Sequence, residues 1–238
     1  MKFLRITKKW WFYLIILAAQ FLLMPVATKN FSFDKIAEII PKTLSNSFLM
    51  NFVDCFIYYQ SFTITMLILL FLLQNKMKKI FAFYVFVSYL LYAVLQNIAI
   101  TEKFGLSFVT INIVMFIMVA LSWLHEAFHG ENSYRFKNIR LYNIWMIPVS
   151  AFLLWWPLDW RSLGFDFHIK HLLFNGSTLA FCPMTPIFLT IMTLNIPKIN
   201  ILTYRITSLI GIIIGFYNMI NFFNPGLNNL AVMHIPLL

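Results

Sequence analysis

Residues 48–74 read FLMNFVDCFIYYQSFTITMLILLFLLQ, and this segment indicates which class of fold to expect. It is long and apolar enough to cross a bilayer, because about 20 helical residues at about 1.5 Å each span roughly 30 Å of hydrocarbon. In the whole chain of 238 residues, 61% are hydrophobic, 18% are aromatic and only 11% are charged, which a single water-soluble core cannot accommodate. The sequence therefore predicts an integral membrane protein.

Apolar segments of similar length recur along the chain and leave no room for a separate soluble domain. We therefore expect an all-α fold, in which residues 1–238 form one polytopic transmembrane helix bundle of about seven membrane-spanning helices. The first span follows the basic tail MKFLRITKK and is interpreted as a retained helix rather than a cleaved signal peptide. Residues 230–238 are too few to cross and are expected to form a partial or re-entrant apolar segment. The expected spans are residues 10–27, 48–74, 80–100, 106–124, 142–157, 172–194 and 203–223.

Lysine and arginine predict the orientation, because short cytoplasmic loops of membrane proteins are enriched in positive charge. With a cytoplasmic N-terminus, most of the 18 basic residues fall on inner segments, and the outer loops carry acidic residues such as Asp159 and Asp166. The net charge of +10 then predicts contact with the lipid bilayer and with anionic headgroups on the cytoplasmic side, and no nucleic-acid partner. We expect a protein of the bacterial cytoplasmic membrane.

The second expected span carries polar residues in a regular pattern. Spacings of 3, 4, 3 and 4 place these residues on one face of a helix. Leucine and isoleucine cover the rest of the helix surface. Asp54 is the acidic residue of this face, and acids within a membrane usually face a partner or a cavity. It is either a hydrogen-bonding contact between helices or a site for a proton, cation or amine. The residues of this polar stripe are Asn51, Asp54, Tyr58, Ser61 and Thr65.

The sixth expected span contains FCPMTPIF, in which Pro183 and Pro186 predict a kink or a break. Broken helices at membrane depth occur where freed carbonyls meet other protein groups or a water-lined cavity, although simple kinks are also common. In the seventh span, Gly211 and Gly215 predict close helix packing, followed on the same side by Asn218. The ligand-binding residues predicted for a polar intramembrane cavity are Asp54, Tyr58, Cys182 and Asn218.

Residues 125–129 read HEAFH, the HExxH spacing that places two imidazoles on one face of a helix. A metal bound there has two ligands, and the glutamate can take a proton from bound water. A helical HExxH at the end of a membrane helix resembles the site-2 protease family of intramembrane zinc metallopeptidases. That resemblance implies zinc as cofactor, His125 and His129 as metal ligands and Glu126 as general base. The chain lacks the Leu-Asp-Gly motif that supplies the family's third ligand, and Glu131 stands where the family has an apolar residue.

A second histidine pair, His168 and His171, lies near Asp159 and Asp166 on the outer side. Its i, i+3 spacing fits either a surface metal site or an amphipathic turn at the membrane interface.

Three functions therefore compete. The Asp54 stripe and the broken sixth span favour a multi-pass protein that binds or transports a small molecule or ion. The HEAFH motif alone favours a zinc metallopeptidase-like hydrolase. A non-catalytic accessory or structural membrane subunit is the third hypothesis.

Overall fold

The computed structural model describes residues 6–159, 162–224 and 226–238, so Lys2, Arg5 and the other residues of 1–5 in the basic tail lie outside the described part of the chain. The described chain is mostly helical, with 71% of residues in helices, which confirms the all-α class. The α-helices are α2 (Trp10–Leu22), α3 (Ile36–Ser45), α4 (Phe56–Leu73), α5 (Lys78–Leu95), α6 (Thr110–His129), α7 (Met146–Trp155), α8 (His171–Phe174), α9 (Phe181–Thr193), α10 (Ile201–Met219) and α11 (Asn228–His234).

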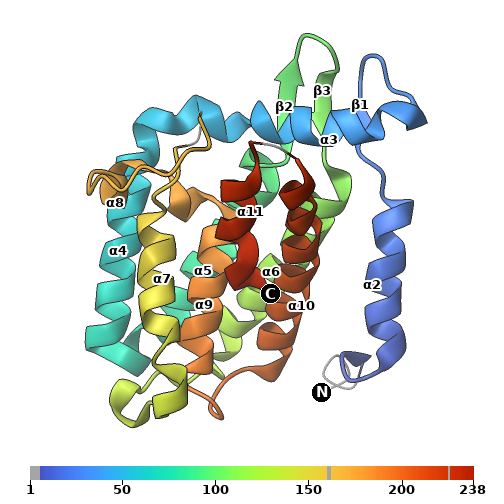
Figure 1. Cartoon of the computed structure of the whole chain (residues 1–238). Coiled ribbons are helices and arrows are strands. Elements are labelled where there is room, and N and C mark those ends of the chain that lie inside the picture. Colours follow the sequence, from blue (N-terminus) through green and yellow to red (C-terminus); the bar gives the residue numbers. More distant parts are fainter. Residues whose placement is uncertain (1–5, 160–161, 225) are drawn as a thin grey trace.

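Short 3-10 segments extend or connect these helices. They are η1 (Phe33–Lys35), η2 (Phe48–Cys55), η3 (Gln74–Met77), η4 (Phe136–Asn138), η5 (Leu141–Asn143), η6 (Ser177–Leu179), η7 (Ile220–Phe223) and η8 (Ile235–Leu237). The helices α4, α5, α6, α7, α9 and α10 run alternately from one end of the bundle to the other, and α2 stands beside them (Figure 1).

Three helical segments are long and apolar enough to cross a membrane: Phe48–Leu95, Thr110–His129 and Ile201–Phe223. A fourth is added if the bent pair His171–Leu179 and Phe181–Thr193 counts as one span. Trp10–Leu22 and Leu141–Trp155 are apolar helices of shorter length. The fold is therefore consistent with integration into a membrane.

The segment Phe48–Leu95 is a helical hairpin rather than one rod. The chain reverses at Gln74, whose positive φ of 50° (ψ −122°) ends α4. Two hydrogen bonds of 2.8 Å then join the antiparallel helices, one from the Tyr84 hydroxyl to Thr63 Oγ1 and one between the hydroxyls of Tyr59 and Ser88.

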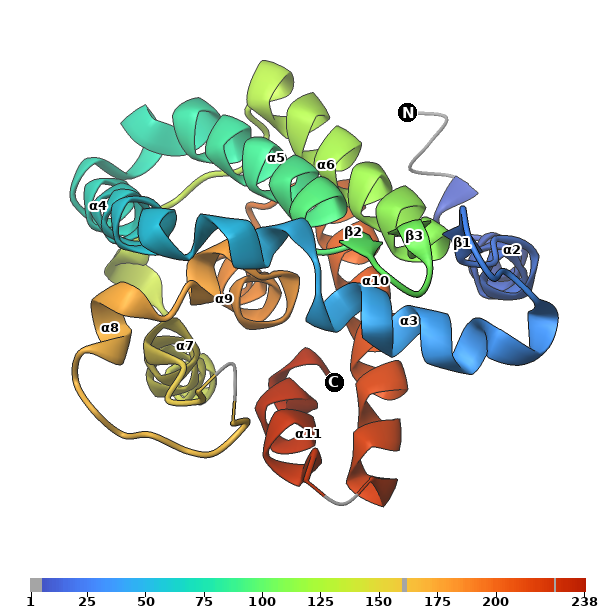
Figure 2. The same cartoon turned by 90° about the horizontal axis from the view of Figure 1, so that it is seen from above.

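The first part of the expected second span does not continue the helix. Residues Phe48–Cys55 form η2, in which Phe52 has non-helical dihedrals (φ −110°, ψ 19°), so the chain turns away from the axis of α4. Figures 1 and 2 show this segment lying across the end of the bundle between α3 and α4. Asp54 therefore lies at the end of the bundle, before α4 begins at Phe56.

A small antiparallel sheet covers the same end, which we call the sheet end. Its strands are β1 (Val26–Ala27), β2 (Ile98–Thr101) and β3 (Gly105–Phe108), in the order β1-β3-β2. The hairpin of β2 and β3 replaces the end of the expected span 80–100 and the start of the expected span 106–124. Residues 98–101 are rich in β-branched side chains, and Gly105, at φ 62°, allows the turn between the two strands. Across the sheet, α3 packs through Ile39 and through the Thr43 hydroxyl, which donates to Ser107 Oγ at 2.8 Å.

The core joins α5, α6, α9 and α10 through aromatic side chains that carry internal polar contacts. The Trp123 indole N–H donates to Thr207 Oγ1 at 3.1 Å and links α6 to α10. The hydroxyls of Tyr89 and Thr185 lie 2.9 Å apart and link α5 to α9. Each buried polar group in these pairs has its partner on another helix, which holds the relative positions of the helices.

The sixth expected span is broken, as predicted, but not at its prolines. The axis turns by 88° between His171–Leu179 and Phe181–Thr193, at Ala180. Pro183 lies in the first turn of α9, where a missing N–H removes no helical hydrogen bond, and Pro186 is accommodated inside the helix. The break thus begins about one turn before the prolines.

Residues Asn228–Leu237 fold back along α10 as α11 and η8. A Cβ added at Gly215 would lie 2.9 Å from Leu238 Cδ2, and one added at Gly211 would lie 3.7 Å from Leu237 Cδ2. The glycine face of α10 therefore packs against the last residues of the chain.

Candidate functional site

The HEAFH segment forms the last turns of α6, which ends at Gly130 in the left-handed conformation (φ 63°). His125 and His129 lie on the exposed face, with their rings stacked at 4.0 Å and 14°. Glu126 lies on the buried face and is 0% exposed. The helix thus separates the glutamate from the imidazoles.

The Glu126 carboxylate is held by two other segments of the chain. Oε1 accepts a hydrogen bond from the backbone N–H of Asn132 at 2.7 Å, and Oε2 accepts one from Asn200 Nδ2 at 2.8 Å. Both oxygens are therefore engaged away from the exposed histidines. Within the described residues, no group of three or more His, Cys, Asp or Glu side chains could hold a metal ion. This geometry gives a metal two imidazole ligands and no base facing it, and it makes Glu126 a structural bridge.

Asparagine side chains extend this bridge into a network around the loop that follows α6. Asn132 Oδ1 accepts from the N–H of Asn200 at 2.7 Å, and Asn200 Oδ1 caps α10 by accepting from Leu202 and Thr203. Asn75 Oδ1 accepts from the N–H of Tyr134 at 2.7 Å. The network shapes one end of the bundle.

Arg135, which follows Tyr134 in this loop, is also held by an asparagine side chain. Asn195 Oδ1 accepts from the N–H of Arg135 at 2.6 Å, and the N–H of Ser133 donates to the carbonyl of Lys198 at 2.9 Å. The loop after α6 and the loop before α10 are therefore fixed side by side. Sequence reasoning missed this arrangement, although the asparagines that follow each helix end are its visible signal.

Between these two loops lies a basic cleft with a volume of about 590 Å³. Its charged lining side chains are all cations, Arg135, Lys137, Arg140 and Lys198. In the described part of the chain none of these four takes part in an ion pair. The cleft is completed by Gln74, Ser133, Leu194, Asn195, Ile196 and Pro197. Its charge and its neutral donors suit an anionic ligand.

The residues predicted for an intramembrane cavity do not converge. Asp54 is exposed, and Tyr58 is 74% exposed on the outer surface of α4. Cys182 lies in the first turn of α9, whereas Asn218 donates from Nδ2 to the carbonyl of Ile214 in its own helix at 2.8 Å. The interior position expected for Asp54 is therefore not found, because η2 carries it to the sheet end.

The polar stripe of α4 faces outward, and a different set of polar residues faces the core. Gln60 and Thr63 are 0% exposed, whereas Ser61 and Thr65 are exposed. Gln60 Nε2 donates to the carbonyls of Leu154 and Leu172 at 3.1 and 3.0 Å. The buried amide therefore links α4 to α7 and α8.

The same amide supports the broken span. Gln60 Oε1 accepts from Thr178 Oγ1 at 2.8 Å, and the Tyr92 hydroxyl donates to the carbonyl of Thr178 at 2.9 Å. Gln96 Oε1 accepts from the N–H of Phe181 at 2.9 Å, which satisfies a donor at the start of α9. These buried polar groups hydrogen-bond to one another and hold the break in place.

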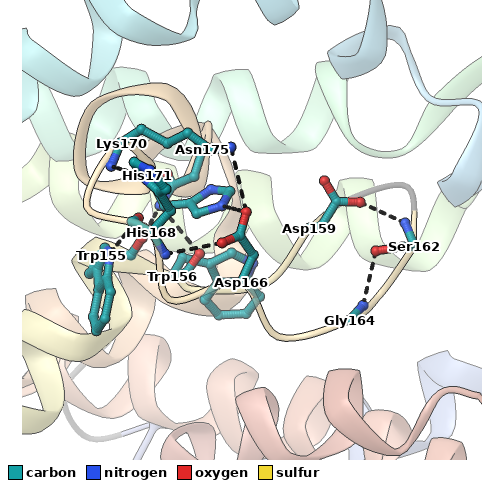
Figure 3. Close-up of polar contacts among 10 residues, drawn as sticks. All are labelled: Trp155, Trp156, Asp159, Ser162, Gly164, Asp166, His168, Lys170, His171 and Asn175. Atoms are coloured by element: carbon teal, nitrogen blue, oxygen red, sulfur yellow. Dashed lines mark hydrogen bonds and ion pairs between the residues drawn. The ribbon is translucent and has the colours of Figure 1, made fainter.

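Figure 3 shows the loop at the sheet end that contains the second histidine pair. The His171 ring contacts Asp166 Oδ2 at 2.7 Å, and Lys170 Nζ lies 3.6 Å from the same oxygen. This hydrogen bond from His171 is the main reason that the pKa of Asp166 is lowered from its usual 3.8. His168 Nδ1 instead accepts from the N–H of Lys170 at 3.3 Å. The two imidazoles thus have separate partners, and both contacts stabilise the turn formed by residues 166–171.

Comparison with known protein families, curated proteins and solved structures finds no match for this chain. The class that the fold itself defines is a helical protein with apolar helices compatible with a membrane.

Proposed function

We propose that this chain is an integral membrane protein of about seven spans, with a cytoplasmic N-terminus, whose basic cleft binds a small phosphate-bearing anion. The observation that carries the proposal is the lining of the cleft, which contains four cationic residues and no acidic residue. We place it in the bacterial cytoplasmic membrane.

The orientation rests on where the charges lie. The end of the bundle that holds the cleft also holds Lys76, Lys78 and Lys79, at the turn between α4 and α5. The sheet end carries acidic residues such as Glu38 and Asp166. This concentration of positive charge supports a cytoplasmic position for the cleft, because cytoplasmic loops are enriched in Lys and Arg.

The chemistry of the cleft favours binding over catalysis. Two guanidinium groups can each grip a phosphate through paired N–H donors, while two ammonium groups add charge without fixed geometry. The lining contains no carboxylate, imidazole or thiol, and its hydroxyl group, Ser133, has no such base beside it in the lining. We therefore propose a binding role for this site.

The other two functions have less support. Transport through the interior requires a polar path, but the buried Gln60 amide is hydrogen-bonded on both its oxygen and its nitrogen. Hydrolysis at HEAFH requires a free carboxylate, but Glu126 is bonded to Asn132 and Asn200. An accessory role is compatible with a binding cleft.

The test uses the full chain in nanodiscs of zwitterionic lipid, titrated with inorganic pyrophosphate by calorimetry. We expect binding that weakens with salt and that falls by at least about tenfold in Arg135→Ala/Lys198→Ala, because charge-assisted hydrogen bonds are lost. Lys76→Ala is the matched control, since it removes a cation at the same end outside the cleft lining. Equal losses in both variants, or no binding by the parent chain, would contradict the proposal.

A further inference from the structure

A groove between α5 and α6 opens on the outer surface of the bundle, near the same end as the basic cleft. It has a volume of about 300 Å³ and is lined by Lys79, Ile80, Phe83, Ala127 and Phe128. Ile80, Phe83 and Phe128 are 54%, 52% and 70% exposed. The groove is thus an apolar surface with a single cation, Lys79, in its lining.

The side chain of Lys79 passes close to Gly130. A Cβ at this glycine would lie 3.1 Å from Cε of both Lys78 and Lys79, so the two side chains pass directly over it. Lys78 Nζ donates to the carbonyl of Gly130 at 2.6 Å and caps α6. In the described part of the chain, the Lys79 ammonium has no hydrogen-bond or ion-pair partner.

An apolar track leads from the groove toward the middle of α6. Exposed residues Phe128, Leu121 and Ile117 follow one another along the helix at spacings of 7 and 4. From Phe128 to Ile117 the helix rises about 16 Å, close to half of the roughly 30 Å hydrocarbon thickness. The track therefore matches the length of one leaflet.

We propose that this groove binds an acidic phospholipid of the cytoplasmic leaflet, with an acyl chain against Phe83 and Phe128 and the phosphate at Lys79. The inference rests on the proposed orientation in the membrane and is independent of ligand binding in the basic cleft. An anionic headgroup complements the charge of the site, because Lys79 is the charged residue in the lining and no acidic side chain lines it. The apolar walls distinguish this lipid from a free phosphate compound, which would gain nothing from them.

The experiment is native mass spectrometry of the delipidated full chain in detergent, titrated with phosphatidylglycerol and with phosphatidylcholine of the same acyl chains. We expect one phosphatidylglycerol bound more tightly than phosphatidylcholine by about fivefold, the effect of one lysine near an anionic surface. Lys79→Gln should remove that preference. Phe83→Ala/Phe128→Ala should weaken both lipids by about tenfold, and its exposed positions spare the core.

Lys76→Gln is the control, because it removes the same charge at the same end outside the groove. The inference is overturned if Lys79→Gln behaves like Lys76→Gln, if phosphatidylcholine binds as tightly as phosphatidylglycerol, or if Lys137→Gln/Lys198→Gln abolishes the preference instead. Pyrophosphate binding measured on the same variants separates the two sites. Lys79→Gln should retain it, whereas Lys137→Gln/Lys198→Gln should lose it.

Discussion

The Glu126 carboxylate accepts a hydrogen bond of 2.8 Å from Asn200 Nδ2 and so ties the last turns of α6 to the N-cap of α10. The two residues are 74 positions apart in the chain. Because Glu126 is fully buried, this contact joins two segments of the chain inside the fold.

Exchanging the two groups of this contact should restore it. Glu126→Gln places an amide N–H₂ against Asn200 Nδ2, and the unsatisfied donors should cost about 1–3 kcal/mol of unfolding free energy. Glu126→Gln/Asn200→Asp reverses donor and acceptor and keeps the carboxylate oxygen that caps α10. Thermal unfolding in detergent should show the double variant to be more stable than Glu126→Gln. A double variant no better than the single would mean that the contact does not stabilise the fold.

The purified protein should contain no stoichiometric zinc, since two stacked imidazoles provide half of the four ligands usual for this metal. Elemental analysis and thermal unfolding with a chelator measure this directly, and neither His125→Ala nor chelation should shift the unfolding temperature. One zinc per chain that is lost in His125→Ala would restore the metallopeptidase hypothesis.

Gln60→Leu should destabilise the bundle by about 2 kcal/mol or more, because it removes the amide donor to the carbonyls of Leu154 and Leu172 and the acceptor of the Thr178 hydroxyl. Ser61→Ala is the matched control at the adjacent, exposed position and should be close to neutral. The measurement is the midpoint of thermal unfolding of each variant, compared with that of the parent chain. Equal effects would show that the buried face of α4 is assigned wrongly.

The loop at the sheet end should loosen in acid. The pKa of Asp166 is lowered below 3.8 in the folded chain, so its stabilising effect is complete above 3.8 and is lost as pH falls through the lowered value. The protection of residues 162–171 against hydrogen exchange, measured relative to the intrinsic rate at each pH, should therefore fall below about pH 4. Asp166→Asn should be less protected at neutral pH, and its protection should change little in that window. Identical pH profiles in the two proteins would exclude this carboxylate as the cause.

Labelling of single cysteines should test the orientation. In a background without Cys55 and Cys182, Lys137→Cys should react with an impermeant thiol reagent only from the cytoplasm. Lys42→Cys, on the exposed side of α3, should react only from outside. Reaction of both positions from one side would show that the number of spans between them is even rather than odd.

Hydropathy could predict that the chain is mostly helical and roughly where its longer apolar helices lie, but it did not predict α3 or several of the helix ends. It also could not predict which polar face of α4 is buried, because both Ser61 and Gln60 belong to plausible helical stripes. The spacing of residues gives their relative positions around the helix axis. The packing of α7 and α8 against α4 decides that the face with Gln60 is the buried one. The role of Glu126 was hidden for a similar reason, since a local motif contains no information on a partner in α10. The turn at Phe52 also has no local signal such as glycine or proline.

The hydrogen bonds of the segment between α8 and α9 restrict how many residues this segment can contain. Asn175 Nδ2 donates to the carbonyl of Trp155, Thr178 bonds to Gln60, and the N–H of Phe181 bonds to Gln96. These partners belong to three different parts of the bundle, so each contact depends on the number of residues between them. Insertion or deletion of one residue here would misplace several buried polar groups at once.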